Sequence, residues 1–147
     1  MEKDISKQPR SVLVIDSDET ILTLISNHFR SIGVKQVYSS SDGADAWKIF
    51  EEKSPDLVIM DWAVQSLNGA AIFNRIRGEI DGALKPIMVI SGKLQKQDFR
   101  LLGEAFSTGF SPKPFTRSVF EREYGKVWAE SRWNYSQASK ISALFAM

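Results

Sequence analysis

Short apolar runs alternate along the chain with longer segments in which apolar residues recur every three or four positions. Three runs, Val12–Ile15, Leu57–Met60 and Pro86–Ile90, are apolar throughout, which is typical of strands buried on both faces of a sheet. Two weaker runs, Val34–Tyr38 and Gly109–Ser111, predict further strands. Strand and helix patterns alternate five times. We therefore predict an α/β fold, with a doubly wound, five-stranded parallel sheet and helices on both of its faces.

A segment with helical spacing follows each predicted strand. The first helix is expected to begin at Asp16–Glu19 and to stop near Gly33, and the third to begin at Asn68–Gly69, because these residue types favour helix ends. The single histidine, His28, is expected at the edge of the first helix. The apolar positions of the five helices lie within residues 21–32, 46–50, 72–76, 99–106 and 120–128.

Composition narrows the class of protein. The chain has 147 residues, 43% of them hydrophobic, which suits one domain with a substantial core. Its formal net charge of +1 gives no global electrostatic reason to bind nucleic acid or an anionic membrane. It has no cysteine and no apolar run long enough to span a bilayer. Residues 1–10 are polar and are expected to form a flexible tail without a signal core, so we expect a cytoplasmic protein.

Four polar side chains are predicted to meet at one edge of the sheet. Asp16, Asp61, Ser91 and Lys113 all lie at the ends of predicted strands, and the carboxyl ends of parallel strands form the edge where open α/β sheets bind ligands. Such a set suits phosphoryl transfer to a carboxylate, with Asp61 as the nucleophile. Asp16 and Asp61 would hold a hard cation such as Mg²⁺, while Lys113 and the Ser91 hydroxyl would face the phosphoryl group. Alternatively, the segment Asp16-Ser17-Asp18 could simply cap the first helix.

The motifs that contain these residues resemble the receiver domain of two-component response regulators, in order and in spacing. They are Val12–Glu19, Pro55–Asp61 with Asn68-Gly69 beyond it, Pro86–Gly92 and Gly109–Phe115. The resemblance implies a flavodoxin-like sheet with strand order 2-1-3-4-5. We predict a stand-alone, chemotaxis-regulator-like receiver domain over residues 11–133 and a C-terminal extension over residues 134–147.

The resemblance also implies which residues form the metal pocket. Asp61 is the expected phosphoacceptor, Asp16 belongs to the acidic pocket, and the backbone carbonyl of Ala63 is the expected third metal contact. Ser17 stands where the family usually has a second acid, so we expect it to contribute weakly or through water. Asp18 is one residue further on and is expected to point elsewhere. Because the charge of the ligands tunes affinity for hard cations, Mg²⁺ is expected to bind weakly.

The remaining implied residues belong to the switch. Ser91 is the expected switch hydroxyl and Phe110 the switch aromatic, in place of the commoner tyrosine. Lys113 matches the lysine of the family, and the Lys113-Pro114 bond is expected to be cis. Residues 64–66 replace the proline that usually follows the phosphoacceptor.

The implied function is a phosphorylation-controlled switch. It would accept a phosphoryl group from a histidine kinase or a histidine phosphotransfer protein. It would then bind a protein partner through its fourth helix, fifth strand and fifth helix, and it would not be a metabolic enzyme. The alternative is a pseudo-receiver, a constitutive interaction module without phosphorylation, which Ser17 favours and Asp61, Ser91 and Lys113 disfavour. A metal-dependent phosphatase is a distant third, because no second acid follows two residues after Asp61.

The C-terminal extension is the least defined part of the prediction. Ala138, Ile141 and Phe145 fall three and four residues apart, which allows a short amphipathic helix. Such a helix needs a surface to pack on, either its own domain or a second subunit, so a homodimer remains open. A frayed tail is the alternative.

Overall fold

The computed structural model describes residues 8–64, 66–79, 82, 84–92, 94, 96–98, 100 and 108–145, with side chains described as far as Ser131. Its strands are β1 (Ser11–Ile15), β2 (Gln36–Ser40), β3 (Leu57–Asp61), β4 (Ile87–Ser91) and β5 (Thr108–Pro112). They form one parallel sheet in the order β2-β1-β3-β4-β5. The predicted fold class and strand order are confirmed.

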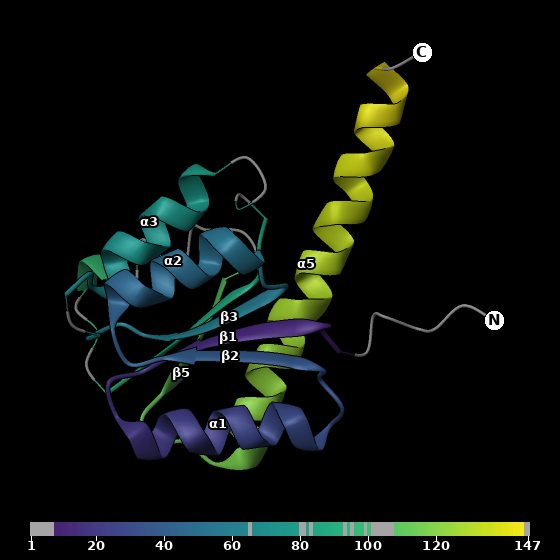
Figure 1. The fold of residues 1–147 in the computed structure, drawn as a ribbon. Coiled ribbons are helices and arrows are strands. Elements are labelled where there is room, and N and C mark those ends of the chain that lie inside the picture. The colour runs from purple at the N-terminus through teal and green to yellow at the C-terminus, as the bar shows by residue number, and fades with distance from the viewer. Residues whose placement is uncertain are drawn as a thin grey trace.

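Helices cover both faces of this sheet (Figure 1). They are α1 (Glu19–Ser31), α2 (Gly43–Lys53), α3 (Gly69–Gly78) and α5 (Arg117–Phe145). Residues 96–98 and 100 are also helical, whereas Phe99 and residues 101–107 of the predicted fourth helix lie outside the described residues.

The apolar strands explain why there are two cores. In β1, Leu13 and Ile15 face the core beneath α2 and α3, whereas Val12 and Val14 face the core beneath α1 and α5. Successive side chains of a strand point to opposite faces, so a strand covered on both sides must be apolar at every position. All residues of β1, β3 and β4 are buried.

The helices begin with polar caps that follow the strands. Asp18, Asp42 and Asn68 are the N-caps of α1, α2 and α3, and each side chain accepts a backbone N–H of the first turn. The first helix was predicted to begin within Asp16–Glu19, and it begins at Glu19, after the Asp18 cap. Gly33 ends this helix with a left-handed φ of 94°, as predicted.

The N-terminal tail is held at its last residues. Arg10 donates its backbone N–H to Asp56 at 3.0 Å and accepts from the backbone of Gln36 at 3.3 Å. Pro9 is buried. The predicted tail of residues 1–10 is therefore attached to the sheet at its end, and residues 1–7 lie outside the described residues.

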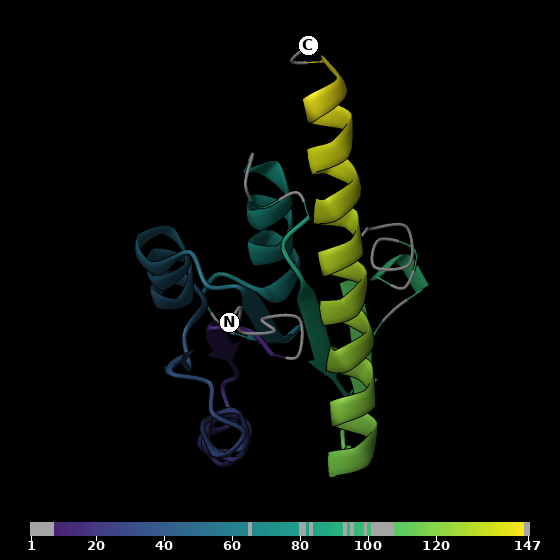
Figure 2. The same ribbon diagram turned by 90° about the vertical axis from the view of Figure 1, so that its right-hand side faces the viewer.

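The C-terminal helix is longer than a receiver domain requires. α5 continues as one helix from Arg117 to Phe145, and its last turns run past the sheet and away from the other elements (Figures 1 and 2). Ser131 still contacts the body, because this buried hydroxyl donates to the carbonyl of Leu84 at 3.0 Å. The predicted extension is therefore continuous with the fifth helix. Within the described part of the chain, no helix has both the length and the hydropathy that a bilayer crossing demands.

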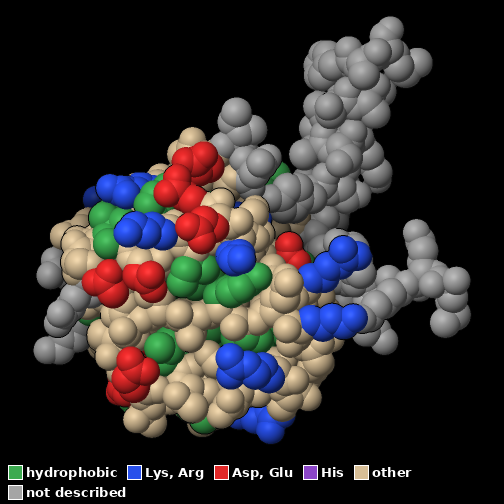
Figure 3. All heavy atoms as spheres, in the orientation of Figure 1, with side chains coloured by type: hydrophobic (Ala, Val, Ile, Leu, Met, Phe, Trp, Pro, Cys, Tyr) green, Lys and Arg blue, Asp and Glu red, His purple; other side chains and the backbone are tan. Residues whose placement is uncertain are grey.

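Acidic and basic side chains both occur across the face in Figure 3, as the near-zero net charge predicts.

Candidate functional site

The predicted residues converge at the carboxyl edge of the sheet. The Lys113 ammonium lies 2.6 Å from Asp16 Oδ2 and 3.5 Å from Asp61 Oδ2. Ser91 is buried at the end of β4, beside β5. The structure thus places Lys113 within ion-pairing distance of both Asp16 and Asp61.

Strand pairing explains why the two carboxylates meet. β1 and β3 are neighbours, with Ile15 opposite Met60, so Asp16 and Asp61 follow directly on paired residues. Both are nearly inaccessible, at 0% and 6% exposure. Backbone N–H groups hold one oxygen of each: Asp18 donates to Asp16 Oδ1 at 2.9 Å, and Ala63 donates to Asp61 Oδ1 at 3.3 Å. The second oxygen of each carboxylate faces Lys113.

Lys113 is placed by the end of β5. Pro112 pairs with Ser91, and the backbone N–H of Lys113 donates to the Ser91 carbonyl at 3.0 Å. The Lys113-Pro114 bond is cis, as predicted. This backbone course directs the lysine side chain back over the edge of the sheet toward the two acids.

Burial makes the negative charge of Asp16 costly. Desolvation raises the pKa of Asp16 and the nearby Asp61 carboxylate raises it further, while the Lys113 ammonium and the Asp18 N–H oppose the rise. The buried Oδ2 atom of Asp16 is paired with the Lys113 ammonium at 2.6 Å. An oxygen of this kind suits coordination of a hard cation.

The donor set fits a small oxygen-ligand site with few protein ligands. Asp16 and Asp61 supply two carboxylates, and the described residues contain no group of three acids or histidines placed to share a metal ion. Ser17 is exposed, and Asp18 caps α1 by accepting from Thr20 at 2.9 Å. Asp18 therefore points away from the pocket, as predicted, and with Lys113 the site carries one net negative charge.

The loop from β3 to α3 closes tightly beside Asp61. Gly69 donates its backbone N–H to the Trp62 carbonyl at 3.1 Å, and a Cβ at position 69 would lie 2.6 Å from the Trp62 Cα. Trp62 itself is buried, with its ring edge-on to Phe73 at 5.9 Å. The indole is thus fixed one residue from the candidate phosphoacceptor.

Phe110 is half-buried in β5, against the core beneath α2 and α3. Its predicted switch role, like that of Ser91, remains a prediction.

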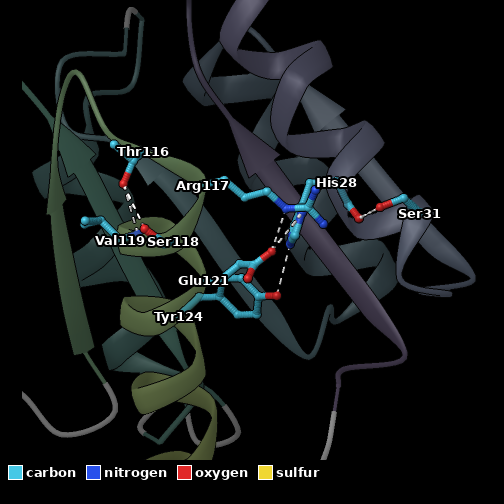
Figure 4. Close-up of polar contacts among 8 residues, drawn as sticks. All are labelled: His28, Ser31, Thr116, Arg117, Ser118, Val119, Glu121 and Tyr124. Carbon is cyan, nitrogen blue, oxygen red and sulfur yellow. Dashed lines mark hydrogen bonds and ion pairs between the residues drawn. The ribbon is translucent and has the colours of Figure 1, made fainter.

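His28 is a residue whose position the sequence did not reveal. It was expected at a helix edge, but it lies between α1 and α5, where Nε2 is 3.0 Å from the Tyr124 hydroxyl and Nδ1 is 3.9 Å from Glu121 (Figure 4). Burial lowers its pKa, and Arg117 adds to this, while Glu121 opposes it. This ring lies away from the Asp61 edge and joins α1 to the C-terminal helix.

A doubly wound sheet with two acids and a lysine at its carboxyl edge defines the receiver class of signalling domain. The response regulator receiver domain family matches residues 12–123, and the chain belongs to this family.

Among curated relatives, chemotaxis protein CheY-3 of Vibrio cholerae is 22% identical over 128 residues, covering 87% of this chain and 98% of the relative. The alkaline phosphatase synthesis regulator PhoP of Bacillus subtilis is 29% identical over 107 residues, covering 73% of this chain and 43% of the relative.

Solved structures share the fold. A response regulator receiver domain protein from Clostridium thermocellum superposes with a TM-score of 0.71 at 23% identity, covering 84% of this chain and 97% of the other. The receiver domain of sensor histidine kinase PA1611 from Pseudomonas aeruginosa, which holds magnesium in its active-site cleft, gives a TM-score of 0.68 at 24% identity. That match covers 80% of this chain and 96% of the other.

Proposed function

We propose that the protein is a phosphorylation-controlled switch in which Asp61 accepts a phosphoryl group from a histidine kinase or a histidine phosphotransfer protein. The observation that carries the proposal is the buried Asp16–Lys113–Asp61 group at the carboxyl edge of the sheet. A salt bridge with a purely structural role would need only one carboxylate to pair with Lys113. The presence of a second carboxylate, on the neighbouring strand, provides a nucleophile beside the Lys113 ammonium.

The chain's own residues have separate tasks in this reaction. Asp61 forms the new O–P bond as the P–N bond to the donor histidine breaks, and the imidazole leaves with the electron pair of that bond. The Ala63 N–H holds Oδ1 of Asp61 and so orients the carboxylate. Lys113 moves from Asp16 toward the added phosphoryl oxygens, because these carry the larger charge. Bound Mg²⁺, held by Asp16, Asp61 and the Ala63 carbonyl, would offset the charge of the incoming group.

The same proposal includes an output. Ser91 and Phe110 would respond to the phosphoryl group and alter the surface formed by the fourth helix, β5 and α5, where a protein partner would bind. A receiver of this kind promotes its own phosphorylation and does not act on a metabolic substrate. The magnesium in the PA1611 receiver domain supports the metal part of the proposal.

The pseudo-receiver alternative has one specific observation in its favour. Ser17 is neutral and Asp18 is committed to capping α1, so the pocket has one acid fewer than the family pattern. A protein-interaction module that has lost phosphorylation would tolerate this loss.

Phosphorylation of Asp61 should be detectable directly from the mass of the intact chain. Incubation with acetyl phosphate and Mg²⁺ is expected to add one phosphoryl group to the intact chain by mass spectrometry, because Asp61 is a rigidly held carboxylate beside Lys113. Asp61→Asn should abolish the addition, and Asp56→Asn, at a carboxylate that accepts from Arg10, is the matched control. An unmodified wild-type chain, under conditions that label an ordinary receiver, would leave the pseudo-receiver as the function.

The affinity for Mg²⁺ should rise in Ser17→Asp. A second anionic ligand strengthens an oxygen-ligand site, and we expect a gain on the order of tenfold. Fluorescence of Trp62, which adjoins Asp61, should report the titration. The other three tryptophans add background, which Trp62→Phe measures because it removes the Trp62 signal alone. Equal affinities in wild type and Ser17→Asp would contradict this account of the pocket.

A further inference from the structure

A chain of hydrogen bonds joins the two sides of the site, and it passes through Ser66 in the loop from β3 to α3. The Ser66 hydroxyl donates to Asp42 Oδ1 and accepts from the Ala44 N–H at 3.3 Å. The other oxygen of Asp42 accepts from the Asp45 N–H at 3.0 Å. One carboxylate thus caps α2 and holds the neighbouring loop.

The chain continues to Asp16 through Ser40 at the end of β2. The Ser40 hydroxyl lies 2.8 Å from both the Asp42 carbonyl and Asp45 Oδ2, which share its one proton, and it accepts from the Asp42 N–H at 3.2 Å. The Ser40 carbonyl accepts from the Asp16 N–H at 3.2 Å. Asp16 and the loop after Asp61 are therefore connected across α2.

The backbone of Ser66 shows that this contact holds the loop in an unfavourable conformation. Its φ is +66°, in the left-handed region that costs a residue with a side chain and suits glycine. The hydrogen bond from Ser66 also lowers the pKa of Asp42, so the acceptor is a carboxylate at neutral pH. A charged acceptor makes the stronger hydrogen bond.

The position of this contact relates it to the site. Gly69 closes the base of the loop on Trp62, and Ser66 fastens its tip to α2. Ala63 lies between Trp62 and Ser66, the two loop residues that make these contacts, and its N–H donates to Asp61.

We propose that Ser66 is a positioning residue. Through Asp42 it fixes the loop that presents the Ala63 backbone to Asp61 and to a divalent cation, and it supplies the rigidity that residues 64–66 lack without a proline. The cation part rests on the proposed function, whereas the fixing of the loop does not.

The substitution that tests this is Ser66→Gly, which removes the hydroxyl and relieves the left-handed backbone at the same time. A loss in this variant cannot come from backbone strain. The chain offers a matched control in Ser54→Gly. Ser54 has a left-handed φ of 44° and caps the opposite end of α2, so it undergoes the same change away from the site.

The first measurement needs no metal. Amide hydrogen exchange followed by NMR should be roughly fivefold to tenfold faster at Ala63 and Val64 in Ser66→Gly than in wild type, as expected for the loss of one hydrogen bond. Ser54→Gly should leave these amides unchanged. Asp42→Ser retains an N-cap for α2 but is too short to reach Ser66, so it should match Ser66→Gly, and the double variant should be no worse than either.

The second measurement is titration with Mg²⁺, followed by Trp62 fluorescence. Affinity should fall several-fold in Ser66→Gly and stay unchanged in Ser54→Gly.

Unchanged exchange at Ala63 and Val64 in Ser66→Gly, or an equal change in Ser54→Gly, overturns the fixing of the loop. Faster exchange with unchanged Mg²⁺ affinity overturns the positioning role at the metal site. Failure of wild type to bind Mg²⁺ refutes the metal part of the proposed function, and exchange alone then decides the role of Ser66.

Discussion

Phe29→Ala is expected to reduce the free energy of unfolding by about 3–5 kcal/mol. Phe29 is completely buried on α1 and packs against Phe120 and Tyr124 of α5, with ring centroids 6.0 and 5.1 Å apart. Its removal leaves a cavity beside the contacts that His28 of α1 makes with Phe120 and Tyr124 of α5. Native domains have about 5–15 kcal/mol of stability, so the loss is a large share of the total.

Urea unfolding followed by circular dichroism would measure this effect. Leu24→Ala on the same helix is the matched control, because Leu24 is 57% exposed and its loss should change stability by no more than about 0.5 kcal/mol. Comparable losses in the two variants would contradict the packing described between α1 and α5.

Truncation after Trp133 is expected to change the oligomeric state and leave the melting temperature of the body nearly unaltered. The removed turns of α5 run away from the sheet, beyond the buried Ser131, so truncation removes no contact with the body that the structure describes. An isolated helix of about a dozen residues is only marginally stable in water, so a partner is needed to maintain it. The apolar spacing of Ala138, Ile141 and Phe145 suits pairing with a second copy of the helix.

Sedimentation of both chains would test this expectation, with the full chain at twice the 16.6 kDa monomer and the truncated chain at the monomer mass. Ile141→Glu should act like the truncation, and Ser142→Glu, beside the apolar spacing, should not. If the full chain sediments as a monomer, the extension does not serve self-association. A lower melting temperature after truncation would place it against its own domain.

The strands and the carboxyl-edge site could be predicted because both depend on local patterns. The runs Val12–Ile15, Leu57–Met60 and Ile87–Ile90 of β1, β3 and β4 are apolar at every position since both faces are covered. Each run is followed at once by a polar residue that the topology brings to one edge. The start of α1 could be predicted only as the range Asp16–Glu19, because aspartate serves equally as a cap and as a pocket acid. Asp18 took the first task and Asp16 the second.

Contacts between distant segments could not be predicted in the same way. His28 meets Tyr124 across 96 positions, and nothing near His28 in the sequence indicates its partner. The Ser66 contact with Asp42 depends on how the loop after β3 folds back toward α2, and both residues are ordinary turn or cap types by themselves. The length of α5 was divided at residue 133 by analogy with the family, whereas the chain itself has no proline after Pro114 to end the helix.

The continuity of α5 turns this helix into a lever. Its first turns rest on β5 and on α1, and its last turns run away from the sheet. The part of α5 that follows Ser131, up to Phe145, is roughly 20 Å of helix. A tilt of only about 10° at the β5 contact would therefore sweep the free end through ~3–4 Å, several times the shift at the receiver surface. A small local rearrangement at Lys113 and β5 would thus be magnified at a point far from Asp61, where a partner could sense it without touching the site.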